Sequence, residues 1–212
     1  MRIRLMALVA AGAFFAATSV QASSLIVNGD FSTPAEGGSW GLSSPILGWT
    51  SATLDTIEVG TSPIYGLACI SASCQNLEVN ANTFGSVYQT VVGLTPGQTY
   101  NLAFDYGGRP GGGDQALQVF FGGNLLATDT GSFGVWTLNS FLVTPTSTTE
   151  VLMFTSLDLG GLPSYGNEIT NVALTATPLP AALPLFASGF GVIGLLARRR
   201  KRKAQATALS KR

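Results

Sequence analysis

Most of the side chains needed for nucleophilic catalysis are missing from this chain. It contains no histidine, so neither a Ser-His-Asp nor a Cys-His arrangement can form. The only lysines, Lys201, Lys203 and Lys211, lie close to the C-terminus, which excludes a Ser-Lys dyad in the rest of the protein. A carboxylate pair, as in glycoside hydrolysis, is what remains, and Asp105 and Asp114 are its best candidates. We expect both to be solvated loop acids and the protein not to be an enzyme.

The loop between these acids contains the one cation of the central part of the chain, Arg109. Its sequence, Gly107 to Asp114, is rich in glycine but lacks the lysine and the following helix that phosphate-binding loops use. We therefore predict a long inter-strand loop. Arg109 either pairs with Asp105 or Asp114 or offers its fork of donors to sugar hydroxyls.

Aromatic side chains in loop-like stretches are the other candidates for ligand contact. Trp40, Tyr65 and Tyr165 lie among Gly, Ser and Pro residues, and exposed aromatic rings bind sugars by stacking on their apolar faces. Packing in the core or at a sheet edge is the alternative, favoured for this set as a whole and for Trp49. The candidate ligand-binding residues are Trp40, Tyr65, Tyr106, Arg109 and Tyr165.

Cys69 and Cys74 are the only cysteines and are separated by four residues. In an exported protein this spacing predicts a local disulfide that fixes a surface loop. Two thiols without any histidine leave the coordination of a metal incomplete. No metal and no cofactor is predicted.

The elements that must position these residues are β-strands. Helical periodicity is almost absent, and short alternating or β-branched runs recur between Gly, Pro, Asn, Ser and Thr residues, as in antiparallel sandwiches. The clearest strand is 99–106, which places Tyr100, Leu102, Phe104 and Tyr106 on one face. Further strands are predicted at 25–27, 76–79, 86–92, 116–121, 125–129, 137–143, 150–157 and 168–176, with a turn at 95–98 and a hairpin at 122–124.

An ordered set of motifs runs through this region. Leu25-Ile26-Val27-Asn28-Gly29-Asp30-Phe31 opens it, Ile46-Leu47-Gly48-Trp49 follows, and Ile169-Thr170-Asn171-Val172-Ala173-Leu174 closes it. Between them come Gly85 to Thr90, Leu94 to Tyr100 and Phe104-Asp105-Tyr106. Together they resemble the choice-of-anchor C family, whose ectodomains are similar to galactose-binding-like jelly rolls. The resemblance implies a jelly-roll sandwich that binds polysaccharide. Such domains often hold a structural Ca²⁺ with two carboxylates, and Ser32 and Asn171 occupy those positions here. We therefore do not predict a bound Ca²⁺ from the resemblance.

Charge is distributed unevenly along the chain. Arg2 and Arg4, an apolar run from Leu5 to Ala17 and Val20-Gln21-Ala22 predict a signal peptide over residues 1–22. The following segment, 23–176, has Arg109 as its only cation against all 11 acidic residues, a formal net charge of −10. This charge argues against nucleic acid as a partner.

The C-terminal segment 177–203 has three parts in a fixed order. Pro178-Leu179-Pro180-Ala181 comes first, an uncharged run over 181–197 follows, and a basic cluster over 198–203 begins with Arg198, Arg199 and Arg200. As a helix the apolar run is about 26 Å long, close to the short limit for a bilayer core. The basic residues predict a cytoplasmic side for this end and for the tail 204–212.

This order resembles the PEP-CTERM sorting signal in its Val-Pro-Leu-Pro-Ala variant, with Thr177 in place of the usual Val. The resemblance implies recognition by an exosortase, an integral-membrane processing enzyme of Gram-negative bacteria that produce exopolysaccharide. A plain single-pass anchor is the alternative. The sequence thus predicts an all-β, antiparallel jelly-roll-like sandwich that is exported to the envelope, cell surface or extracellular matrix and binds carbohydrate. The competing hypothesis is a structural or adhesive matrix protein anchored permanently by its C-terminal helix.

Overall fold

The computed structural model describes residues 23–52, 56–130 and 133–177. The predicted signal peptide, apolar helix, basic cluster and tail fall in 1–22 and 178–212, outside the described residues. Within the described ranges, no helix has the length and apolar character needed to cross a membrane.

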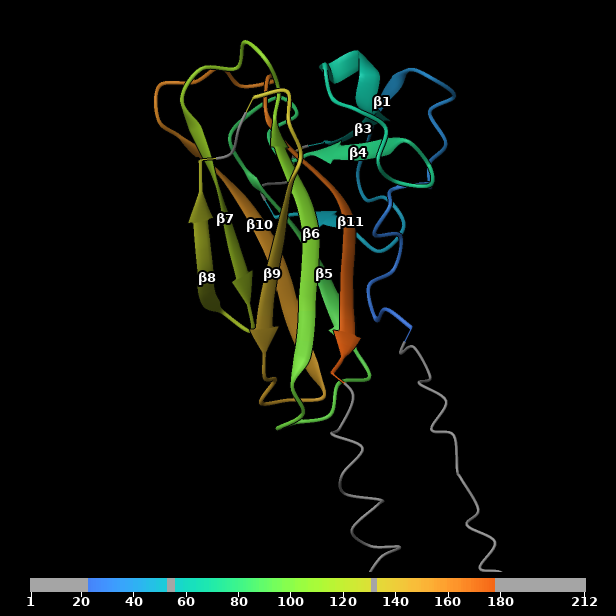
Figure 1. Cartoon of the computed structure of the whole chain (residues 1–212), viewed down its shortest axis with the longest axis vertical. Coiled ribbons are helices and arrows are strands. Elements are labelled where there is room, and N and C mark those ends of the chain that lie inside the picture. Colours follow the sequence, from blue (N-terminus) through green and yellow to red (C-terminus); the bar gives the residue numbers. More distant parts are fainter. Residues whose placement is uncertain (1–22, 53–55, 131–132, 178–212) are drawn as a thin grey trace, which may run out of the picture. The chain divides into compact units, whose positions relative to one another are not determined.

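The described part of the chain folds into two antiparallel β-sheets (Figure 1). The larger sheet has the strand order β1-β3-β4-β11-β6-β9 and the smaller has the order β2-β5-β10-β7-β8. A single turn of 3-10 helix, η1 (Ser62–Tyr65), follows β3. The strands are β1 (Trp40–Ser43), β2 (Thr50–Ser51), β3 (Ile57–Thr61), β4 (Gln75–Glu78), β5 (Ser86–Val92), β6 (Tyr100–Gly108), β7 (Gln115–Phe121), β8 (Asn124–Asp129), β9 (Thr137–Val143), β10 (Thr149–Asp158) and β11 (Asn167–Ala176).

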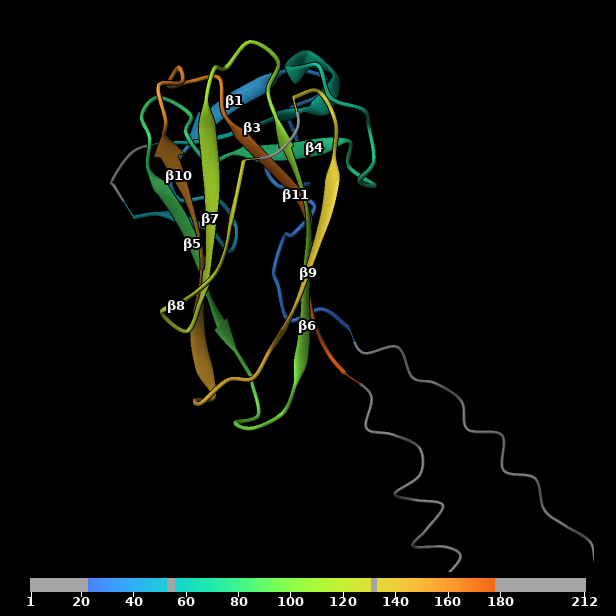
Figure 2. The same ribbon diagram turned by 60° about the vertical axis from the view of Figure 1, so that its left-hand side comes forward.

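The chain alternates between the two sheets in the jelly-roll manner. β4, β11, β6 and β9 are neighbours in one sheet, and β5, β10, β7 and β8 are neighbours in the other. Consecutive strands β4 and β5, β5 and β6, β6 and β7, and β9 and β10 therefore lie in different layers, an arrangement of eight strands typical of jelly rolls. Figure 2 shows the two layers, with β5, β7, β8 and β10 in one and β6, β9 and β11 in the other.

Alternate residues of the strands form the core between the layers. On β6, Tyr100, Leu102 and Phe104 are buried and belong to one hydrophobic cluster. Trp49 is completely buried in the same cluster, with its ring centre 5.5 Å from that of Phe31 and 5.9 Å from that of Phe154. The expectation that Trp49 is a core residue is confirmed.

Most predicted strands occur within two residues of their expected bounds, and β5 and β9 match them fully. The segment 25–27 is wrong as a strand: it makes an isolated backbone bond from Leu25 N to the Leu174 carbonyl, 2.9 Å long, without joining a ladder. β1, β2 and β3 were not predicted. Cys69 and Cys74 form the expected disulfide.

Candidate functional site

Three glutamates lie side by side on the outer face of the larger sheet. Glu58 of β3 and Glu168 of β11 are both direct register partners of Glu78 on β4. Their neighbours Ile57, Leu77 and Ile169 belong to the core, so strand alternation turns the glutamates to the opposite face. All three are nevertheless buried, with 7%, 0% and 0% of their surface exposed, respectively.

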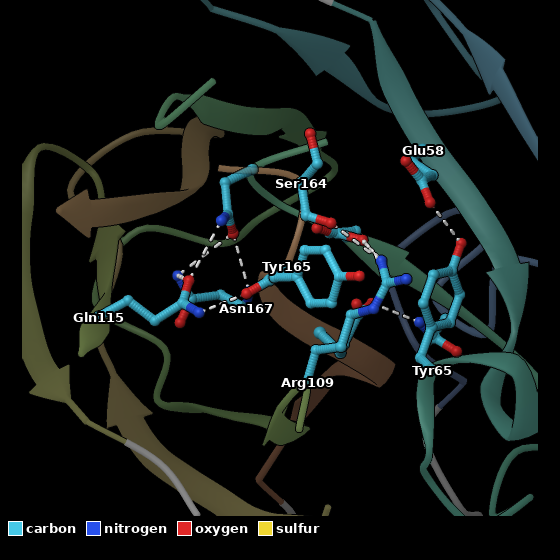
Figure 3. A network of polar contacts seen from close by, with 11 residues as sticks. Glu58, Tyr65, Arg109, Gln115, Ser164, Tyr165 and Asn167 are labelled. Atoms are coloured by element: carbon cyan, nitrogen blue, oxygen red, sulfur yellow. Dashed lines mark hydrogen bonds and ion pairs between the residues drawn. The ribbon is translucent and has the colours of Figure 1, made fainter. Parts of the chain in front are cut away.

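Arg109, which follows β6, covers this row. Its Nη1 donates to Glu78 Oε2 at 3.1 Å and to the Ser164 carbonyl at 3.0 Å. The guanidinium lies between two aromatic rings, 4.8 Å from the centre of Tyr65 and 4.4 Å from that of Tyr165 (Figure 3). An ion pair and two cation–π contacts therefore hold one end of this side chain, which is 22% exposed.

η1 places Tyr65 over the sheet. The Tyr65 hydroxyl donates to Glu58 Oε1 at 2.7 Å, while Ser62 Oγ donates to Asn76 Oδ1 at 2.9 Å. A Cβ on Gly60 would come within 2.3 Å of the Tyr65 hydroxyl oxygen, so a glycine at this position of β3 leaves room for the ring. Asn76 completes the connection by donating from Nδ2 to Glu168 Oε2.

Burial changes the protonation of all three carboxyl groups. Desolvation, together with the nearby Glu58 charge, raises the pKa of Glu78 to about 7, even though Arg109 opposes the change. Desolvation and the adjacent Glu78 raise the pKa of Glu168 well above its usual value. The pKa of Glu58 is also raised by desolvation, against the hydrogen bond from Tyr65. At neutral pH the row therefore holds fewer than three negative charges.

A recess of about 330 Å³ opens beside Arg109. Leu42 and Ile64 form the apolar part of its walls. Trp40 also lines it, with 54% of its surface exposed. Its polar lining comes from Glu58, Tyr65, Asn82, Arg109 and Ser164. The recess thus combines an exposed indole with hydrogen-bond donors and acceptors, the composition of a small-ligand site.

Of the predicted ligand-binding residues, Trp40, Tyr65 and Arg109 line this recess, and Tyr165 stacks on Arg109. Tyr65 is only 2% exposed, so it belongs to the floor rather than to a free loop. Tyr106 does not fit the prediction. Its ring is fully buried in the core, and its hydroxyl donates to Asn167 Oδ1 at 2.5 Å. The inward face of β6 places Tyr106 between the sheets, on the far side of the larger sheet from the glutamate row.

The expected partner of Arg109 was also wrong. Neither Asp105 nor Asp114 pairs with it; Glu78 does. Asp105 accepts instead from Asn171 Nδ2 at 2.9 Å, and Asp114 lines another concavity near Phe133. Sequence reasoning missed the three glutamates altogether. The available signal was a single acid within each of three strands, at a position that alternates with core residues.

A separate concavity of about 530 Å³ is lined by residues that include Asp30, Ser32 and Asn171. Asp30 Oδ1 accepts from Ser32 Oγ at 3.0 Å. Among the described residues, no group of three or more His, Cys, Asp or Glu side chains is placed to hold a metal ion.

No protein-family model matches this chain. Two curated proteins are similar to it in sequence. Halomucin of Haloquadratum walsbyi is 28% identical over 201 residues, which cover 86% of this chain. A multifunctional-autoprocessing repeats-in-toxin protein of Vibrio cholerae is 24% identical over 161 residues, covering 75% of it. The chain spans only 2% and 3% of the lengths of these relatives.

Solved structures with a similar fold include carbohydrate-binding modules. A family 61 module in complex with β-1,4-galactotriose has a TM-score of 0.45 and 17% identity, with 73% of this chain and 99% of that chain covered. The CBM22-1 xylan-binding domain from Paenibacillus barcinonensis has a TM-score of 0.45 and 10% identity, with 75% and 94% covered. The enzymatically active domain of a bacteriophage CBA120 tailspike protein has a TM-score of 0.44 and 17% identity, with 73% and 21% covered. Because all of these TM-scores lie below 0.5, we infer the ligand chemistry from the recess alone.

Proposed function

We propose that the β-sandwich binds polysaccharide in the recess beside Arg109. The observation that supports this most directly is Trp40, which stands 54% exposed at a concavity that also contains Glu58 and Arg109. Contact between the apolar indole ring and water is unfavourable, and a ligand that stacks on the ring removes that contact. Pyranose rings have apolar faces suited to such stacking.

The polar lining suits the hydroxyl groups of a sugar. Arg109 uses Nη1 for its contacts with Glu78 and Ser164, so its other donors remain available toward the recess. Asn82 adds an amide, and Glu58 adds a carboxylate oxygen. Hydroxyl groups donate and accept at once, and a lining that mixes both kinds of partner satisfies them. Because Arg109 is fixed by an ion pair and two rings, little side-chain entropy is lost on binding.

We propose that this site is not catalytic. Glycoside hydrolysis uses two carboxyl groups that flank the scissile bond. Glu58 is the only carboxylate that lines the recess among the described residues, since Glu78 is fully buried behind Arg109. The role that fits Glu58 is ligand contact rather than acid–base chemistry.

We further propose that the protein reaches its polysaccharide by export and exosortase sorting. The support is the order of the C-terminal segment, with Pro178-Leu179-Pro180-Ala181 before an apolar run and a basic cluster. Mass spectrometry of the mature protein tests this. Sorting predicts a new C-terminus near Ala181, whereas an intact Arg212 would indicate permanent anchoring and contradict the processing step.

Binding is tested on a glycan array with the full chain and two alanine variants. Trp40→Ala removes the exposed ring at the recess, and Leu138→Ala removes a 68% exposed apolar side chain on β9 as the matched control. We expect Trp40→Ala to weaken binding by about tenfold or more, because covering a large apolar side chain contributes roughly 1.5–3 kcal/mol. Leu138→Ala should bind like the parent. Absence of binding to every glycan would favour the structural or adhesive matrix protein instead.

A further inference from the structure

One oxygen of Glu58 has no hydrogen-bond partner among the described residues, although the residue as a whole is more than nine-tenths buried. Glu58 is 7% exposed, and its Oε1 accepts from the Tyr65 hydroxyl. Among the hydrogen bonds between described residues, Oε2 accepts none, while the side chain lines the recess. Among the described residues, the buried carboxylate oxygens without a partner are Oε1 of Glu78 and Oε1 of Glu168, so Glu58 Oε2 is accessible from the recess and can accept a hydrogen bond from a ligand there.

The charges around Glu58 favour a cationic donor. The positive charge of Arg109 is already offset by Glu78 at 3.1 Å. Glu168, which is fully buried beside Glu78, is a third acidic residue and supplies no charge that could neutralise Glu58. Glu58 therefore leaves the recess with an excess of negative charge, in a domain whose only cation is Arg109.

The walls of the recess tolerate a cation as well. The exposed indole of Trp40 lines it, and aromatic faces attract ammonium groups. A sugar carboxylate, by contrast, would face Glu58 with a charge of the same sign, and the guanidinium that might attract it is already paired.

We propose, on the basis of the polysaccharide site inferred above, that the recess selects a sugar with a free amino group, whose ammonium donates to Glu58 Oε2. The substrate class is then a polysaccharide with de-N-acetylated amino sugars, rather than a neutral or acidic one. N-acetylation removes the positive charge and puts a bulky amide in its place, so the acetylated form of the same chain loses this contact.

Protonation gives the proposal a second consequence. Among the described residues, the titratable groups that interact with Glu58 are Tyr65 from η1, Arg109 after β6, Glu78 from β4 and Glu168 from β11. Leu42, opposite Glu58 on β1, is uncharged. Burial raises the pKa of Glu58, and a bound ammonium opposes this by favouring the carboxylate. Binding of the amine should weaken as the pH falls through this raised pKa, because protonated Glu58 no longer attracts a cation.

Calorimetric titration of the full chain tests the choice of ligand. The probes are β-1,4-glucosamine oligomers, their N-acetylated counterparts of equal length, and oligogalacturonate. We expect the free amine to bind about tenfold or more tightly than the acetylated oligomer, because a charge-assisted hydrogen bond is roughly twice as strong as a neutral one. Glu58→Gln should abolish this preference. Asp114→Asn removes the same charge from an exposed position outside the recess and should preserve it.

The outcomes separate this proposal from the one on which it rests. Equal or tighter binding of the acetylated oligomer, or tightest binding of oligogalacturonate, overturns amine selection and leaves polysaccharide binding in place. Binding to no oligomer and to no glycan overturns both. If Glu58→Gln fails to fold, the salt dependence of the wild-type chain decides. The preference for the amine must fall as salt rises, and a salt-independent preference would contradict it.

Discussion

Glu78 and Glu168 are direct partners across the β4–β11 ladder, and both are fully buried. Oε1 of each carboxyl group is buried without a hydrogen-bond partner among the described residues. Two adjacent carboxylates cannot both be ionised at low cost in such a place, and a proton held between them removes the repulsion. We infer that the pair shares one proton at neutral pH, which leaves a single negative charge for Arg109.

The protein should therefore become less stable as the pH rises. The pKa of Glu78 is raised from 4.5 to about 7 and that of Glu168 is raised well above 4.5, so the folded state binds more protons than the unfolded chain above pH 4.5. Stability that is complete below this pH is lost progressively toward pH 7 and beyond. We expect the midpoint of thermal unfolding, followed by circular dichroism, to fall by about 5 °C between pH 5 and pH 8.

Glu168→Gln provides the control for this prediction. Its amide replaces the shared proton with a permanent donor toward Glu78, so the decline with pH should become shallower. A melting temperature that is constant or rises over the same range in the parent protein would contradict the shared proton.

Removing the Arg109 guanidinium should lower the unfolding free energy, because the glutamate row loses its countercharge. Arg109→Met leaves Glu78 buried without a countercharge and removes both cation–π contacts. We expect urea denaturation at pH 8 to show a loss of about 3 kcal/mol, the scale for breaking a buried pair. The loss should be smaller at pH 5, where Glu78 is protonated and needs no partner. A cost that is the same at both pH values would show that Arg109 stabilises the fold through packing alone.

Two tryptophans in nearby segments should respond in opposite ways to the same substitution. Trp49 is fully buried between Phe31 and Phe154, so Trp49→Ala should cost about 3–5 kcal/mol of unfolding free energy. Trp40 is 54% exposed, so Trp40→Ala should change stability by about 0.5 kcal/mol or less. Denaturant titration measures both. A large destabilisation by Trp40→Ala would mean that its ring supports the fold, and the interpretation of the recess would change.

Strand periodicity predicted the long strands of the fold and failed on the short ones. β5 and β6 alternate in burial over seven residues, whereas β9 exposes Leu138 and Leu142, so its pattern indicates a strand without identifying the inward face. β3 does not alternate in burial, because Glu58 and Gly60 on its outer face are covered by Tyr65. The apolar residues Ile57 and Val59 do alternate with Glu58 and Gly60 in the sequence, but over only five residues, and so short a run is a weak strand signal.

The recess was predictable only in part for a related reason. Its aromatic residues were found by composition, because Trp40, Tyr65 and Tyr165 lie among turn-forming residues. Glu58, Glu78 and Glu168 come together only through the register of three strands, two of them far apart in the chain. That register depends on tertiary pairing, so no local pattern could place Arg109 against Glu78 instead of the nearby Asp105 or Asp114.

Gly60 offers a way to disturb the recess without removing any side chain that lines it. Gly60→Ala places a Cβ within 2.3 Å of the Tyr65 hydroxyl oxygen, so the ring must move away from β3 and from Glu58. We expect a loss of about 1–3 kcal/mol in unfolding free energy, as for other overpacked sites, together with weaker glycan binding. In a Tyr65→Leu background the clash is absent, and the same substitution should cost much less. Equal costs in the two backgrounds, measured as a double-mutant cycle by urea denaturation, would contradict steric coupling between Gly60 and Tyr65.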